Sequence, residues 1–172
     1  LHNFVNFAND PHGNYLIQDI MKTVNYIRYN EIIDQIIICF RDIFNHKNGT
    51  RVIQKAIEIA EEEDSLDYLD ELSDHIIKCI EDQNGNHVIQ KLIERLPKGK
   101  HGIILRAIME KVYDLSIHQY GCRVIQRVFE FCKETEKDDI LKEITHKVLD
   151  LCMNQYGNYV IQHIVEKQSF DK

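Results

Sequence analysis

The chain has 172 residues, of which 44% are hydrophobic and 28% charged, a balance typical of one soluble globular body that buries a substantial core. The longest apolar runs, such as residues 36–40, fall far short of the roughly 20 residues that cross a bilayer, and nothing resembles a signal peptide, so we expect a soluble protein without membrane association. The formal net charge of −7 argues against a protein that holds nucleic acid mainly by neutralising phosphates.

A glycine recurs every 36 residues and opens the same short phrase each time. The first phrase, Gly-Asn-Tyr-Leu-Ile-Gln, begins at Gly13, and the last, Gly-Asn-Tyr-Val-Ile-Gln, begins at Gly157. The full set of glycines is Gly13, Gly49, Gly85, Gly121 and Gly157. Because the register never slips, the sequence predicts a tandem array of five helical repeats.

The segment before each glycine carries apolar residues at the three- and four-residue spacing of an amphipathic helix. These columns are Ile33, Ile36, Phe40 and Ile43, then Leu69, Leu72, Ile76 and Cys79, then Leu105, Ile108, Val112 and Leu115, then Leu141, Ile144, Val148 and Leu151. We therefore expect one first helix in each repeat, ended by a short polar turn such as residues 82–85. The glycine of that turn is expected to adopt a positive φ before the second helix begins.

The second helix of each repeat is amphipathic in a different way. At about 100° per residue, the apolar Val160, Ile161, Ile164 and Val165 fall in one arc, which we expect to be core. The opposite arc is polar in every repeat and contains one unvarying column. A glutamine stands five residues after each glycine, although Glu, Lys or Arg would serve helix stability equally well. Something other than helix propensity therefore selected an amide at Gln18, Gln54, Gln90, Gln126 and Gln162.

Two further columns lie beside these glutamines. The side chain four residues earlier shares a helix face with the glutamine, and this column holds Asn14, Thr50, Asn86, Cys122 and Asn158. The next column contains only flat side chains, which stack on nucleobases through aromatic or guanidinium faces. Its members are Tyr15, Arg51, His87, Arg123 and Tyr159. Each repeat thus offers two side chains for a base edge and one for a base face.

A basic stripe is predicted one residue past the glutamines. Its members are Lys55, Lys91, Arg127 and His163, while Asp19 occupies the first repeat. Glu58, Glu94 and Glu130 stand three residues further on and are expected to orient these cations by ion pairs worth a few tenths of a kcal/mol.

The Gly-Asn-Tyr-Val-Ile-Gln and Gly-Cys-Arg-Val-Ile-Gln phrases at this spacing resemble the Pumilio (PUF) family of RNA-binding proteins, over nearly the whole chain. The resemblance implies an all-α, right-handed curved α-solenoid of Pumilio-type repeats with a 36-residue period. Residues 1–172 would form one Pumilio repeat domain of about five repeats, either a fragment of a longer array or a short divergent protein, with lowered affinity. The implied ligand is single-stranded RNA, read at one base per repeat.

In the family, Asn with Gln reads uracil, because two amides match the donors and acceptors of its edge, and a small Cys or Ser with Gln reads adenine. The uracil pairs are Asn14/Gln18, Asn86/Gln90 and Asn158/Gln162, and the adenine pair is Cys122/Gln126. Thr50/Gln54 departs from the common pairs. Adenine is the preferred base there, and a repeat with relaxed base specificity stays open as an alternative. Antiparallel binding then predicts a 5′-UAUAU-3′ core within a UGUAUAUA-type 3′ UTR element.

The resemblance also implies a cytoplasmic protein that regulates mRNA after transcription, by translational repression or decay, with deadenylation or translational-repressor proteins on its outer surface. Two alternatives stay open. One is an α-solenoid scaffold that binds protein along its groove. The other is a Pumilio-like RNA binder of low specificity in ribosome biogenesis.

Residues suited to catalysis or metal binding lack the required spacing. The five cysteines are odd in number and contain no C-x-x-C pair, which favours reduced thiols. The nine histidines are scattered without ligand spacing. His118 lies four residues before Cys122, like a nucleophile pair, but its column elsewhere holds Asp10, His46, Asp82 and Asn154. We expect no enzyme activity, metal or cofactor.

Overall fold

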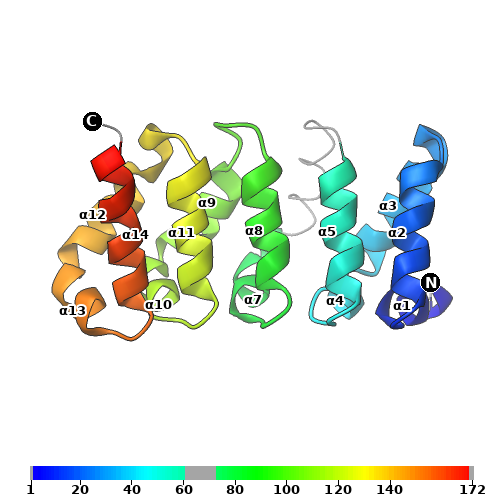
Figure 1. Cartoon of the computed structure of the whole chain (residues 1–172), viewed down its shortest axis with the longest axis horizontal. Coiled ribbons are helices and arrows are strands. Elements are labelled where there is room, and N and C mark those ends of the chain that lie inside the picture. Colours follow the sequence, from blue (N-terminus) through cyan, green and yellow to red (C-terminus); the bar gives the residue numbers. More distant parts are fainter. Residues whose placement is uncertain (1, 61–72, 171–172) are drawn as a thin grey trace.

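The computed structural model describes residues 2–60 and 73–170, and every regular element in these ranges is helical. Five helices of 10 to 14 residues lie side by side in one layer (Figure 1). They are α2 (Gly13–Thr23), α5 (Gly49–Ile59), α8 (Asn86–Arg95), α11 (Gly121–Phe131) and α14 (Gly157–Phe170). Each begins at, or one residue after, a glycine of the 36-residue series.

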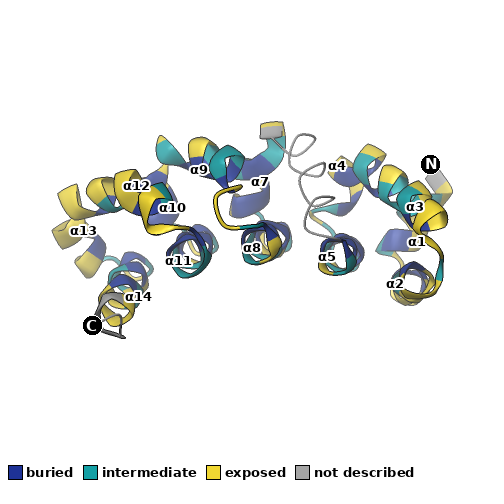
Figure 2. Cartoon of the chain, turned by 90° about the horizontal axis from the view of Figure 1, so that it is seen from above, coloured by how far each residue is buried: buried dark blue, intermediate teal, exposed yellow. Residues whose placement is uncertain are grey.

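A second layer packs behind the first. It contains α1 (His2–Asn9), α3 (Tyr26–Ile38), α4 (Phe40–Ile43), the 3₁₀ turn η2 (Ser73–His75), α7 (Ile76–Glu81), α9 (Gly102–Met109), α10 (Val112–Ser116), α12 (Glu134–His146) and α13 (Val148–Met153). Seen from above, both layers curve together, with the five-helix layer on the concave side (Figure 2). The predicted all-α curved solenoid is confirmed. None of the helices in the described ranges has the length and apolarity to cross a bilayer.

The expectation of a single first helix per repeat was wrong. Ten residues before each later glycine the helix bends, at Cys39, Lys111 and Lys147, where φ lies between −97° and −126° and ψ between 7° and 15°. His75 occupies the same position before α7, with φ −117° and ψ −5°. The apolar spacing continues across the bend, because residues on both sides face the core, so periodicity alone cannot locate it. Leu69 and Leu72 of these columns lie outside the described residues.

The glycines of the series serve a different purpose from the predicted one. None has a positive φ; among the described residues that conformation occurs only at Gly99. Instead, a Cβ at Gly121 would lie 2.5 Å from the carbonyl oxygen of Leu115, and one at Gly49 would lie 2.4 Å from that of Ile43. Real Cβ atoms do not approach backbone so closely. Glycine is therefore required because the start of each concave helix packs directly on the end of the helix before it.

The core runs without interruption from repeat to repeat and is open at both ends of the described array. Val52, the equivalent of Leu16 in the next repeat, is fully buried, whereas Leu16 is 50% exposed. At the other end, Ile93 is fully buried and the equivalent Val165 is 57% exposed, so the expectation that Val165 belongs to the core was wrong. Burial at these positions comes from the neighbouring repeat, as expected of a solenoid.

Candidate nucleic-acid interface

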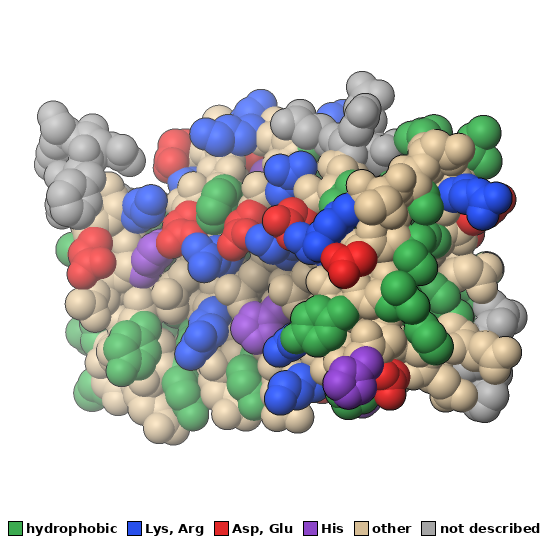
Figure 3. All heavy atoms as spheres, turned by 45° about the vertical axis from the view of Figure 1, so that its right-hand side comes forward, with side chains coloured by type: hydrophobic (Ala, Val, Ile, Leu, Met, Phe, Trp, Pro, Cys, Tyr) green, Lys and Arg blue, Asp and Glu red, His purple; other side chains and the backbone are tan. Residues whose placement is uncertain are grey.

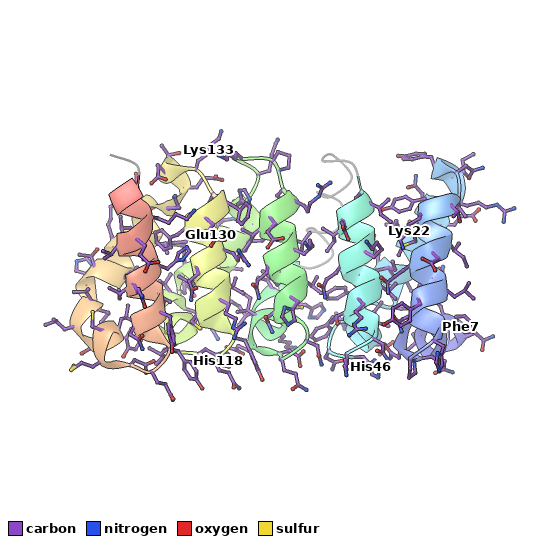
Figure 4. The ribbon with its side chains drawn as sticks, in the orientation of Figure 1. Phe7, Lys22, His46, His118, Glu130 and Lys133 are labelled. Carbon is purple, nitrogen blue, oxygen red and sulfur yellow. The ribbon has the colours of Figure 1, made fainter. Side chains whose placement is uncertain are left out.

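The turn before each concave helix is closed by one acceptor side chain, in the same column of every repeat. Oδ1 of Asp82 accepts from the backbone N–H groups of Asn84 at 2.8 Å and Gly85 at 2.7 Å. Nδ1 of His118 accepts from the N–H groups of Tyr120 and Gly121, both at 3.2 Å. Asp10 and Asn154 each accept the equivalent pair of bonds, and Nδ1 of His46 accepts from the N–H group of Asn48 at 3.2 Å. Figure 4 shows His46 and His118 in the turns below α5 and α11. His118 is therefore a capping residue and not the base of a nucleophile pair.

These caps also fix a charge. The N–H groups of Gly13 and then His12 hold the pKa of Asp10 below its ordinary value, because both donate to its ionised form. The capped turn fixes the residue at which each concave helix begins, and therefore fixes the register of the columns along that helix.

The first base-edge column is buried, although the helical projection places it on the polar arc. Asn14, Thr50, Asn86 and Cys122 are all buried, and Asn158 is partly buried. Their donors turn back onto carbonyl oxygens of the preceding turn. Nδ2 of Asn86 donates to the carbonyl oxygens of Asp82 at 2.9 Å and Gln83 at 3.0 Å, and Asn14 makes the same pair of bonds. Thr50 and Cys122 donate through Oγ1 and Sγ in the same way.

This arrangement leaves the side-chain amide oxygen of the asparagine to accept a bond from the same helix. With both hydrogens of its amide used, Asn86 presents Oδ1, which accepts a bond of 2.8 Å from Nε2 of Gln90. Gln18 and Asn14 form the same bond at 3.1 Å. In the last repeat Gln162 instead donates to Glu166 at 3.2 Å. The structure therefore brings the two predicted base-edge columns into direct contact in the first and third repeats.

The flat column lies outermost. Tyr15, Arg51, His87, Arg123 and Tyr159 are all exposed. Nη1 of Arg51 donates to the hydroxyl of Tyr15 at 3.0 Å, so the first two repeats are linked through this column. Although His87 is exposed, partial desolvation by neighbouring side chains, and then the nearby Arg123, lower its pKa, which favours the neutral imidazole that stacks as an aromatic ring.

The columns surround a hollow between α8, α11 and α14 of about 450 Å³. Its lining brings together predicted residues from three repeats, among them Gln90, Cys122, Arg123, Gln126 and Tyr159. Tyr156 and Gln119, which the sequence analysis did not single out, line the same hollow. They stand one and two residues before glycines of the series, and that fixed offset is the signal by which they could have been found.

Acidic and basic side chains alternate across the concave face (Figure 3), and two of them, Arg127 and Glu130, also line the hollow. The predicted pairs within a repeat are confirmed: Lys55 Nζ lies 2.6 Å from Glu58 Oε2, Lys91 Nζ lies 3.0 Å from Glu94 Oε2, and Arg127 bonds Glu130. These contacts between basic and acidic side chains, which we call the ladder, also join neighbouring repeats, a feature that spacing along one helix did not predict. Arg127 Nε lies 3.4 Å from Glu94 Oε1, and His163 Nε2 lies 3.4 Å from Glu130 Oε1.

The five repeats that carry these columns match a known family of repeats in sequence. A sequence model of the Pumilio-family RNA binding repeat matches residues 3–37, 45–73, 75–108, 111–145 and 147–171. Comparison with curated protein sequences gave no match.

Three solved structures are similar over nearly the whole chain. The Puf3 RNA binding domain bound to Cox17 RNA 3′ UTR recognition sequence site A is 40% identical with a TM-score of 0.86, covering 94% of this chain and 47% of that one. The Puf4 RNA binding domain bound to the HO endonuclease RNA 3′ UTR recognition sequence is 31% identical with a TM-score of 0.93, covering 99% and 53%. The RNA-binding domain of yeast Puf5p bound to SMX2 RNA is 30% identical with a TM-score of 0.83, covering 98% and 49%.

The chain thus spans about half the length of these solved domains. Because the repeat model matches five successive segments and the identity to the Puf3 domain reaches 40%, the chain belongs to the Pumilio family of RNA-binding repeat proteins.

Proposed function

We propose that the concave face binds single-stranded RNA at one base per repeat and prefers a 5′-UAUAU-3′ core within a UGUAUAUA-type 3′ UTR element. The observation that carries the proposal is the repetition of one station: a glutamine, a short side chain anchored in the turn and an exposed flat side chain, at the same register on adjacent helices. The similar Puf3 and Puf4 domains were solved with 3′ UTR recognition sequences bound, which supports RNA as the ligand class.

In the third repeat, the geometry of the anchored pair supports the proposal of uracil. Asn86 Oδ1 keeps one lone pair after accepting from Gln90, and Gln90 Nε2 keeps one hydrogen. A uracil edge presents N3–H to the first and O4 to the second. Cytosine reverses both groups, so it would set acceptor against acceptor and donor against donor. The anchoring bonds keep Asn86 from rotating to correct that mismatch.

The fourth repeat is suited to adenine. The Cys122 thiol is small and its hydrogen points to the carbonyl oxygen of Gln119, so the hollow has room for a purine. The amide of Gln126 then pairs with the exocyclic amine and ring nitrogen of adenine. Thr50 has its hydroxyl hydrogen committed in the same way, and adenine is the base proposed for Thr50 with Gln54.

Affinity in this scheme comes mainly from stacking on the flat column. Base stacking on such side chains is worth about 1–3 kcal/mol per base, so five stations supply useful affinity without many phosphate contacts. A protein with this activity would act on mRNA 3′ untranslated regions in the cytoplasm, and repressor or deadenylation proteins would bind its convex layer.

The proposal is tested by fluorescence anisotropy with labelled RNA carrying UAUAU in a UGUAUAUA context, beside RNA with its U and A positions exchanged. We expect preference for the first RNA and its loss in the Gln126→Ala, Arg123→Ala double variant. Lys142→Ala is the control, since Lys142 is exposed on α12 in the convex layer and pairs with Asp139. Equal binding of both RNAs would indicate a low-specificity binder, and binding of neither would indicate a protein scaffold.

A further inference from the structure

We infer that Arg127, a residue of the fourth repeat, determines base specificity in the third repeat by fixing the orientation of the Gln90 amide. The inference rests on the proposed function and names a specificity-determining residue that touches no base edge itself. It starts from one contact: Nε of Arg127 lies 3.5 Å from Oε1 of Gln90 and 3.4 Å from Oε1 of Glu94, so its single N–H is shared between these two oxygens.

That contact belongs to a chain of donors that all point the same way. Arg127 donates to the oxygen of Gln90, Nε2 of Gln90 donates to Asn86, and Nδ2 of Asn86 donates to the carbonyl oxygens of Asp82 and Gln83. Turning the Gln90 amide by 180° would set its NH₂ against the guanidinium and its oxygen against Asn86 Oδ1. Both bonds would be lost together, so the two orientations are far from equivalent.

Arg127 is itself held in place from both sides. It lies between Glu94 of the third repeat, at 3.4 Å, and Glu130 of its own repeat, and its side chain is 36% exposed. Figure 4 places Glu130 on the upper half of α11, facing the groove. A guanidinium held by two carboxylates keeps a fixed direction, which a single flexible lysine would not.

The orientation decides which bases fit. With Oε1 turned to Arg127, Gln90 offers only an N–H to the groove, which suits a base with a keto oxygen at that place, as in uracil. With the amide reversed, Gln90 would offer an acceptor, which suits the exocyclic amine of cytosine or adenine. Arg127 therefore excludes amino bases from the third station.

Other repeats provide internal contrasts. In the fourth repeat, where adenine is proposed, the equivalent residue from the following repeat is His163, which lies against Glu130. In the first repeat that residue is Lys55, whose bond goes to Glu58, and no hydrogen bond joins Lys55 to Gln18 within the described part of the chain. Among the described residues, a contact that holds the glutamine amide from the following repeat is thus specific to the third station.

The test compares three RNA cores, UAUAU, UACAU and UAUAC, so that cytosine replaces uracil opposite the third or the first repeat. In Arg127→Met and in Arg127→Lys, the affinity ratio of UAUAU to UACAU should fall by about fivefold or more, while the ratio of UAUAU to UAUAC stays unchanged. Lys55→Met is the matched control and should weaken all three RNAs equally. Equal weakening of all three RNAs by Arg127→Met would overturn the inference and make Arg127 a phosphate contact.

A second measurement needs no RNA. In ¹⁵N-labelled protein, the side-chain NH₂ protons of Gln90 should show nuclear Overhauser effects to protons of Asn86 in the unmodified chain, and these should weaken in Arg127→Met because the amide is no longer held in one orientation. Unchanged Overhauser effects between Gln90 and Asn86 would overturn the inference. If the unmodified chain binds none of the RNAs, the proposed function fails, and this spectrum still decides whether Arg127 orients the amide.

Discussion

Replacing Gly121 by alanine tests whether close backbone contact, and not turn conformation, requires the glycines of the series. The new Cβ would lie 2.5 Å from the carbonyl oxygen of Leu115 and 3.0 Å from its Cα, both backbone atoms that cannot rotate away. Overpacking of this kind costs about 1–3 kcal/mol, partly offset by up to about 1 kcal/mol of better helix propensity. We expect Gly121→Ala to lower the free energy of unfolding by about 2 kcal/mol.

Gly102 provides the matched control, because it also begins a helix, α9, and has no positive φ. A Cβ there would meet only Nη1 of Arg106 at 3.4 Å, the movable end of a long side chain. Gly102→Ala should therefore be neutral or stabilising by up to about 1 kcal/mol. Urea unfolding followed by circular dichroism measures both. The reasoning is refuted if Gly121→Ala unfolds at the same urea concentration as the unmodified chain, or if both variants lose equal stability.

Three further predictions concern the caps, the stacking column and the charge of the groove. His118→Ala should cost about 1 kcal/mol of stability through loss of the cap. His118→Asn, which places before α11 the residue type that caps the turn before α14, should restore most of it in the same urea assay. Partial burial and Arg123 depress the pKa of His87, so its contribution to the free energy of unfolding is present above the ordinary pKa of 6.5 and is lost as pH falls through the lower folded pKa. His87→Gln should reduce the difference between the free energies of unfolding at about pH 7.5 and about pH 5. An unchanged difference would contradict this prediction. RNA affinity should fall with salt less steeply than for a protein that contacts 6–10 phosphates, since cations of the ladder are already paired with glutamates; a steep slope in anisotropy titrations at several salt concentrations counts against stacking as the main source of affinity.

The repeats, the columns and the ion pairs within a repeat could be predicted from sequence because each depends on spacing along one helix. The burial of Asn86 could not, because a helical projection places it on the polar arc and says nothing of the turn carbonyls that its amide reaches. The contact of Arg127 with Gln90 depends on how far apart adjacent helices stack, which no single repeat encodes. The prediction for Gly121 was wrong because glycine serves both tight turns and close contacts, and its sequence neighbours do not separate the two roles.

The buried column that contains Asn86 also limits how the base preference of such a protein can be changed by mutation. At the position of Asn86, a side chain must donate to carbonyls of the turn below it before it can offer anything to RNA, and the residues found there, Asn, Thr and Cys, are all short and carry a donor. A designer who installs Leu or Glu at that position to change the base would leave those carbonyls without their partner and would loosen the turn that sets the register of the whole helix. The side chains available for RNA recognition at this position are therefore limited to those that also satisfy the turn.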